Sequence, residues 1–207
     1  MKHLLHLVVD SGSAYWLMIF NPTTATLVHS QPLALEALDA LLQADVDALL
    51  ASLPPLTDDR PSPIGQTNMM IIGRDDRERV LFACSTAAIG WDGTESQDGY
   101  GYWRSARYRF RIVELTATGV VPLVEHNQSA LLKEGAWLGG RVFDCIDGDA
   151  YFFCQPAEAN NGTHEQLIKL TQRGEVEVTT WAGVSYQTIA HFTTPAGLYV
   201  ALSEQAA

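Results

Sequence analysis

The sequence LTATGVV at residues 115–121 returns in altered form as LTQRGEV at residues 170–176. The shared pattern is Leu-Thr, two variable residues, Gly, a variable residue and Val, and the two copies lie 55 residues apart. Apolar runs precede and follow each copy. A short polar segment with a Gly between two apolar runs is typical of a tight turn that joins antiparallel strands. The repeat therefore predicts a β-hairpin that is used at least twice.

A weaker copy of the same hairpin lies near the N-terminus. Residues 20–28 follow the same order of strand, polar turn and strand, although Thr24 stands where the other copies have Gly. This copy precedes LTATGVV by 95 residues, which exceeds the repeat spacing by about 40 residues. We expect the excess to be an insertion of a different kind.

The insertion begins with the one clear helical pattern of the chain. Pro32 suits a first helical turn, where its missing N–H is not needed. Apolar residues then recur at steps of three and four, at Leu35, Leu38, Leu42, Val46, Leu49 and Leu53. The acidic residues are assigned to the other faces: Glu36, Asp39, Asp45 and Asp47.

Pro54 and Pro55 end the pattern, so a helix is expected over residues 33–53. With the polar loop that follows, residues 32–66 are interpreted as an insertion within a single domain of residues 1–207. The alternative is a helix that is integral to an α+β fold. In either role the helix is expected to pack on a sheet, and its acidic side is a second candidate interface.

The rest of the chain predicts short strands joined by turn-like connections. Three are expected near the N-terminus, at residues 3–9, 15–20 and 26–30. Ten more are expected at 68–73, 79–85, 107–116, 120–125, 141–147, 150–155, 166–171, 175–181, 187–193 and 197–203. Residues 68–125 and 141–181 each supply four strands in meander order.

Such four-stranded antiparallel units resemble the blades of a β-propeller. The expected fold is therefore mostly β, with propeller-like units and one inserted helix. Residues 3–30 and 187–203 could complete one shared blade, but three blades are too few to close a ring. Either two chains form one ring as a homo-oligomer, or the strands form an open twisted antiparallel sheet or a β-sandwich packed on the helix.

Composition limits the class of protein. The chain has 207 residues, 47% of them hydrophobic, and a formal net charge of −11, which fits a globular protein and argues against bulk binding to nucleic acid or to anionic membranes. No apolar run reaches the roughly 18–20 residues of a membrane span. The N-terminus is too short and too polar to indicate a signal peptide, so a cytoplasmic protein is expected.

The three cysteines fit that expectation, since their number is odd and none lies in C-x-x-C spacing. Cys84 and Cys154 lie in apolar runs and are expected to be buried, inert thiols. A disulfide between Cys145 and Cys154 is the alternative.

The most distinctive local stretch runs from residue 90 to residue 111. It begins with an expected loop, residues 90–103, that is rich in Gly and aromatic residues. Seven of the ten arginines in the chain lie between Arg74 and Arg111, and four of these seven belong to this stretch. On the strand that follows, alternate arginines share one face and the apolar residues between them share the other. The candidate binding residues are Trp91, Tyr100, Tyr102, Trp103, Arg104, Arg107, Arg109 and Arg111.

Several interpretations of this stretch remain open. Alternating arginines can protect a solvent-facing strand and pair with local carboxylates, which is a structural role. They can also bind a protein partner or an anionic ligand, since guanidinium groups pair with carboxylates and phosphates. A single nucleic-acid strand stacked on the aromatic rings is the third option, against which the acidic composition argues.

Motifs for catalysis are absent. The sequence contains no nucleophile elbow, no phosphate-binding loop and no dinucleotide fingerprint. The six histidines lie outside metal-binding spacing, and no catalytic residue, metal or cofactor is predicted. The favoured hypothesis is a non-catalytic interaction module, such as an accessory subunit or an inhibitor of the immunity type. The alternative is a small-ligand-binding protein or enzyme whose site is assembled from distant loops.

Overall fold

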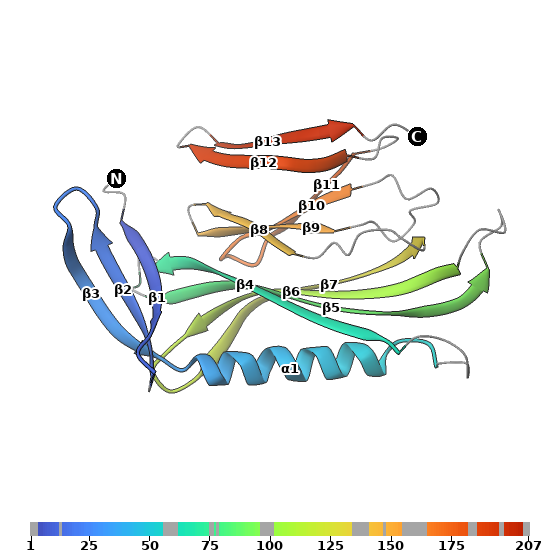
Figure 1. Ribbon diagram of the computed structural model, residues 1–207, viewed down its shortest axis with the longest axis horizontal. Coiled ribbons are helices and arrows are strands. Elements are labelled where there is room, and N and C mark those ends of the chain that lie inside the picture. Colours follow the sequence, from blue (N-terminus) through green and yellow to red (C-terminus); the bar gives the residue numbers. More distant parts are fainter. Residues whose placement is uncertain are drawn as a thin grey trace.

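The protein is described by a computed structural model that covers residues 4–12, 14–55, 62–74, 77, 79–95, 102–133, 141–146, 148–154, 165–181, 186–194 and 197–204. It is mostly β with one helix (Figure 1). The first part of the chain forms β1 (Leu5–Asp10), β2 (Tyr15–Asn21), β3 (Thr26–Leu33) and α1 (Leu35–Ala51). The middle forms β4 (Ile64–Arg74), β5 (Val80–Glu95), β6 (Tyr102–Leu115) and β7 (Val120–Lys133). The remainder forms β8 (Arg141–Ile146), β9 (Asp149–Cys154), β10 (Glu165–Leu170), β11 (Val176–Trp181), β12 (Tyr186–Thr194) and β13 (Gly197–Glu204).

The two predicted four-stranded meanders are confirmed. Strands β4 to β7 form one antiparallel sheet in chain order, and β8 to β11 form another. The propeller is not confirmed, because none of the sheets among the described residues closes on itself or on another to form a ring. The idea of a blade shared by the two ends of the chain is wrong, since β1–β2–β3 and β12–β13 are separate sheets.

The large sheet β4–β7 is covered on both faces (Figure 1). On one face lies α1, and there the N-terminal sheet joins them in a shared core built around Leu17, Leu38, Phe82 and Leu115. On the opposite face lies the sheet β8–β11, where Phe110 and Phe152 pack with ring centroids 4.8 Å apart. The molecule is therefore layered as helix, sheet and sheet, which agrees with the open-sheet and sandwich alternative.

Strand β6 shows how the sequence pattern produces this layering. Successive side chains of a strand point to opposite faces, so residues 107, 109, 111, 113 and 115 face α1. The intervening Tyr108, Phe110 and Ile112 face β8–β11 and are fully buried. The predicted separation of arginines from aromatic and aliphatic residues on this strand is confirmed.

The repeated motif forms equivalent hairpins, β6–β7 and β10–β11, but their turns differ. In each, a threonine hydroxyl accepts a hydrogen bond from a backbone N–H across the turn: Thr116 from Gly119, and Thr171 from Glu175. Leu115 is paired with Val120, whereas Leu170 is paired with Val176, so the second turn is one residue longer. Gly174 accordingly adopts a φ of +88°, a conformation that disfavours other residues.

The helix departs from its prediction at two positions. Pro32 belongs to β3 and is paired with Trp16, because a proline without an N–H is tolerated on the edge strand of a sheet. Asp45 was assigned to an outer face, yet it is only 4% exposed and belongs to the buried side of α1. Close approach of α1 to the large sheet depends on Gly65, where a side chain would overlap Val46.

The central strands are longer than predicted. Residues 90–103 were expected to be a loop, but β5 continues to Glu95 and β6 begins at Tyr102. Glu95 is paired with Tyr102. Gly90 and Gly93 therefore lie within β5, whereas Gly99 and Gly101 lie outside the described residues.

Candidate functional site

The arginine face of β6 is directed toward α1. Asp45 comes from the middle of α1, three residues after Leu42 and four before Leu49, and so belongs to the buried side of the helix. It meets Arg109 and Arg111, which lie two residues apart on the facing side of β6.

The carboxylate of Asp45 accepts three hydrogen bonds from these two guanidinium groups. Arg111 binds it with two bonds, from Nε to Oδ2 at 2.9 Å and from Nη2 to Oδ1 at 3.0 Å. Arg109 donates from Nη1 to Oδ1 at 2.6 Å. Bidentate pairing of arginine with a carboxylate is among the strongest polar contacts in proteins, so this cluster fixes α1 to β6.

Strand β7 completes the cluster from the other side. Glu125 is paired with Arg111 across the strands, and its carboxylate lies 2.9 Å from Arg111 Nη2. Asn127 is paired with Arg109, accepts from Arg109 Nε at 3.0 Å and donates to Glu125 at 2.8 Å. Two cations and two carboxylates balance, which leaves the arginine cluster of Asp45, Arg109, Arg111, Glu125 and Asn127 with no net charge.

The remaining predicted binding residues are placed less completely. Arg107 is half-buried, and its Nη1 donates to the carbonyl of Ala106 at 3.2 Å. The backbones of Trp91 and Arg104 are paired across β5 and β6, and Tyr102 and Trp103 open β6, whereas Tyr100 lies outside the described residues. The binding role of this set stays a prediction, while the arginine cluster shows that two of its members also have a structural role.

Cys84 lies on β5 next to the arginine cluster, where it is paired with Arg111 of β6. Burial raises its pKa to about 12, against a smaller opposing effect of the Arg111 charge. A thiol of such pKa stays protonated near neutral pH. The prediction of a buried thiol is confirmed for Cys84, whereas the side chain of Cys154 lies outside the described residues. Cys145 is not part of a disulfide, so the alternative bridge to Cys154 is wrong.

The described residues give no support to a metal site, since they contain no group of three or more His, Cys, Asp or Glu side chains placed to hold a metal ion. Among the described residues, no helix is long and apolar enough to span a membrane, and α1 has 17 residues.

A second surface, not foreseen from the sequence, lies on the N-terminal sheet. The pairing of β1 with β2 brings Leu5 opposite Phe20, Leu7 opposite Met18 and Val9 opposite Trp16. Directly opposite residues in antiparallel strands share a face, so these six side chains form one surface, which we call the outer face: Leu5, Leu7, Val9, Trp16, Met18 and Phe20.

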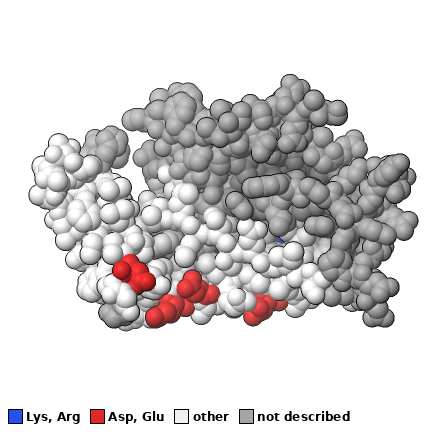
Figure 2. All heavy atoms as spheres, in the orientation of Figure 1, with Lys and Arg blue, Asp and Glu red and all other residues white. Residues whose placement is uncertain are grey.

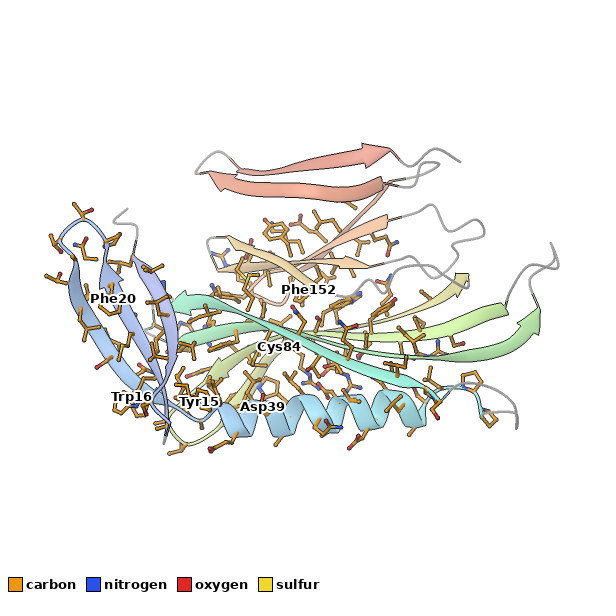
Figure 3. All side chains as sticks on the ribbon, in the orientation of Figure 1. Tyr15, Trp16, Phe20, Asp39, Cys84 and Phe152 are labelled. Atoms are coloured by element: carbon orange, nitrogen blue, oxygen red, sulfur yellow. The ribbon has the colours of Figure 1, made fainter. Side chains whose placement is uncertain are left out.

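The outer face is apolar although it is turned away from the core. The other side of the same sheet carries Leu17, Ile19 and Leu33, which are buried against α1 and the large sheet. Figure 3 shows Tyr15 directed toward α1 and Trp16 away from it. On the outer face Leu5 is 49% exposed and Leu7 39% exposed.

Charge is nearly absent from this sheet. Between Leu4 and Leu35 the sequence contains a single Asp, Glu, Lys or Arg, which is Asp10, although the whole chain has 37 such residues. On the side drawn in Figure 2 the N-terminal sheet is almost entirely white, and the acidic side chains gather along α1. The outer face is therefore uncharged as well as apolar.

The signal for this surface was present in the sequence. Strands β1 and β2 are apolar at both odd and even positions, which indicates burial on both faces of a sheet. The described residues bury Leu17 and Ile19 on one face, although Val8 on that same face is 37% exposed. Comparison with protein-family models, with curated proteins and with solved structures found no match to the chain.

Proposed function

We propose that this chain is a non-catalytic protein-interaction module whose docking surface is the outer face of the N-terminal sheet. The observation that carries the proposal is an apolar, uncharged sheet face on an otherwise acidic molecule, exposed at Leu5 and Leu7 and half-buried at its other four residues. Contiguous apolar surface of this kind is costly to leave in water and marks sites of association.

The composition of the surface supports a protein as its partner. Trp16, Met18 and Phe20 form the central row, and aromatic residues and methionine are enriched at the centres of protein interfaces. Aliphatic side chains of β1 flank this row, and Leu27 on β3, paired with Phe20 and 50% exposed, extends it. An anionic membrane is disfavoured as the partner, because it would repel a chain of net charge −11.

The rest of the fold serves as a rigid support for this surface. The inner side of the sheet is fixed in the core by Leu17 and Ile19, and the backbone N–H of Ala34, just after β3, donates to the carbonyl of Thr116. A surface held in this way loses little conformational entropy when it binds, which favours affinity.

The test is site-specific photo-crosslinking in cell lysate. A photoreactive phenylalanine analogue replaces Met18 at the centre of the outer face, or Thr118 in an exposed turn as the matched control. We expect crosslinked protein adducts at position 18 and not at position 118. Equal adducts at the two positions, or none at position 18, contradict the proposal.

A second candidate surface is the predicted arginine and aromatic stretch, which would suit an acidic partner or an anionic ligand. The observation that favours it is Arg107, a cation next to the neutral arginine cluster whose described hydrogen bond goes to a backbone carbonyl. The test is Arg107→Glu, which we expect to weaken capture of an acidic partner while Thr118→Glu, an added charge in a distant turn, does not. Loss of capture with both variants, or with neither, contradicts this role.

A further inference from the structure

We infer that Arg107 and Ser129 form a binding site for a phosphate group, at the end of the row of arginines on β6. The inference rests on the second candidate surface proposed above and names the ligand of Arg107. Three observations carry it: the pairing of β6 with β7, the position of α1 and the exposure of β7.

The pairing of β6 with β7 places an arginine opposite a polar residue three times in succession. The pairs are Arg111 with Glu125, Arg109 with Asn127, and Arg107 with Ser129. Directly paired residues share one face of the sheet, with Cβ atoms about 4.5–5.5 Å apart. In the first two pairs the β7 side chain meets the guanidinium group, at 2.9 Å and 3.0 Å. In the third pair, Ser129 brings a hydroxyl group and no negative charge.

Helix α1 gives the third pair no carboxylate either. Asp45 binds the arginines of the first two pairs. One helical turn later the buried side of α1 carries Leu49, which packs in one cluster with Leu53 and Ala88. Ala88 is the β5 residue paired with Arg107. The helix is therefore apolar at the level of Arg107, where the neighbouring arginines meet Asp45.

Arg107 consequently carries the uncompensated positive charge of this face. Its Nη1 donates to the carbonyl of Ala106 at 3.2 Å, and no carboxylate of the described residues pairs with it. The side chain is half-buried, and a cation that is partly withdrawn from water is stabilised by a counter-charge. The arginine cluster beside it has no net charge, so the local positive potential is that of Arg107.

The site opens to solvent along β7. Glu125, Asn127 and Ser129 are all exposed, so α1 leaves this border of the sheet uncovered. Strand β7 is also the last strand of its sheet. An anion can therefore approach Arg107 past Ser129. The nearest carboxylate on β7, that of Glu125, belongs to a residue about 13 Å away along the strand and is paired with Arg111.

The donors of the site favour phosphate over a carboxylate. A guanidinium group offers parallel N–H donors, and the Ser129 hydroxyl is a further donor on the neighbouring strand. A tetrahedral phosphate has oxygens in several directions and up to two negative charges, so it can accept from both groups at once. A planar carboxylate is matched by the guanidinium alone. With so few bonds, we expect a dissociation constant of about 1 mM for inorganic phosphate.

The experiment is a titration of the purified full chain with inorganic phosphate at constant ionic strength, followed by proton–nitrogen NMR. We expect the signals of the Ser129 backbone amide and of Arg107 Nε–H to shift together and to saturate. Arg107→Gln should abolish the shift of the Ser129 amide. Arg173→Gln is the matched control: it makes the same substitution at an exposed arginine in the β10–β11 turn and should leave that shift unchanged.

Substitutions at the exposed position 129 test the site with Arg107 in place, and they decide the question if Arg107→Gln does not fold. Ser129→Glu puts a carboxylate of the chain itself opposite Arg107, so the affinity for phosphate should fall by about tenfold or more. Ser129→Gln has the same size without the charge and still donates from its amide, so it should keep the affinity within about threefold.

Four results overturn the inference: no saturable shift in the wild type, an unchanged shift in Arg107→Gln, equal losses with Ser129→Glu and Ser129→Gln, or an equal response to acetate. Each is distinguishable from failure of the proposed function. If phosphate does not bind but Arg107→Glu still loses capture of an acidic partner, the second surface stands and its ligand is a carboxylate. Crosslinking at position 18 reports on the outer face alone.

Discussion

Arg111 and Asp45 face each other as a two-bond pair between the middle of β6 and the buried side of α1, with donor–acceptor distances of 2.9 and 3.0 Å. Both side chains are largely withdrawn from water, at 11% and 5% exposure. Withdrawing two charges from water is costly, and mutual pairing offsets that cost only when the geometry is good and the remaining donors are satisfied. Arg109, Glu125 and Asn127 supply those additional bonds.

The first prediction concerns the carboxylate at the centre of the cluster. Asp45→Asn removes the negative charge and leaves two nearly buried guanidinium groups facing a neutral amide. We expect the free energy of unfolding to fall by about 3 kcal/mol, the lower end of the range for breaking a buried ion pair, because Arg109 keeps some contact with water. Urea denaturation measures this change.

The matched control for Asp45→Asn is Asp39→Asn, the same substitution on the exposed side of α1. It should change the free energy of unfolding by less than about 0.5 kcal/mol. Similar effects of the two substitutions would show that the cluster contributes little beyond the general charge of the helix.

The second prediction separates geometry from charge. Arg111→Lys keeps a positive charge but cannot form the two parallel bonds to Asp45, because lysine carries a single nitrogen. We expect a loss of about 1.5–3 kcal/mol of unfolding free energy, the value of one charge-assisted hydrogen bond. Arg107→Lys, at a side chain that is not bonded to Asp45 in the described contacts, should be nearly neutral. Equal losses in denaturant midpoint for the two variants would assign the effect to arginine packing rather than to the bidentate pair.

The third prediction is a pH dependence caused by Cys84. Its pKa is raised by burial from an ordinary value of 9.0 to about 12, so between these values the thiol is ionised in the unfolded chain but protonated in the folded one. Unfolding then releases a proton, and the stability that the neutral thiol contributes below pH 9 is lost as the pH rises through this window, by at most about 1.4 kcal/mol per pH unit.

Comparison of slopes isolates this effect from other groups that titrate in alkali. Urea unfolding of the wild type and of Cys84→Ala is measured at several pH values above 9, and the variant should lose stability less steeply. Thr118→Ala, in an exposed turn and without a titratable side chain, should keep the wild-type slope. Parallel slopes for the wild type and Cys84→Ala would mean that the thiol ionises as readily in the folded protein as in the unfolded chain.

The strand order was predictable from the sequence because each hairpin carries its own local signal. All thirteen described strands overlap predicted ones, and the alternation of arginines with Tyr108, Phe110 and Ile112 fixed the two faces of β6. The packing of sheets on one another was not predictable in the same way, because meander order is shared by propellers, sandwiches and open sheets.

Asp45 and the outer face show why the candidate sites were harder to predict than the fold. An acidic residue on an amphipathic helix is assigned to solvent by default, and the exception depends on a distant strand that places two arginines opposite it. The apolar residues on both faces of β1 and β2 were visible, but apolarity alone does not reveal which face the fold leaves uncovered.

The fourth prediction uses the repeat itself, in which two glycines occupy the same motif position but different conformations. Gly174 has a φ of +88°, a backbone conformation that costs roughly 1–2 kcal/mol for a residue with a side chain. Gly119 is not among the described residues of positive φ, and a methyl group there would meet no atom within 4 Å. Gly174→Ala should therefore lower the free energy of unfolding by about 1 kcal/mol or more, whereas Gly119→Ala should be neutral or slightly stabilising, because alanine restricts the unfolded chain. This asymmetry follows from the one extra residue in the turn between Leu170 and Val176. Urea denaturation measures both changes, and equal effects of the two substitutions would mean that the two turns have the same conformation.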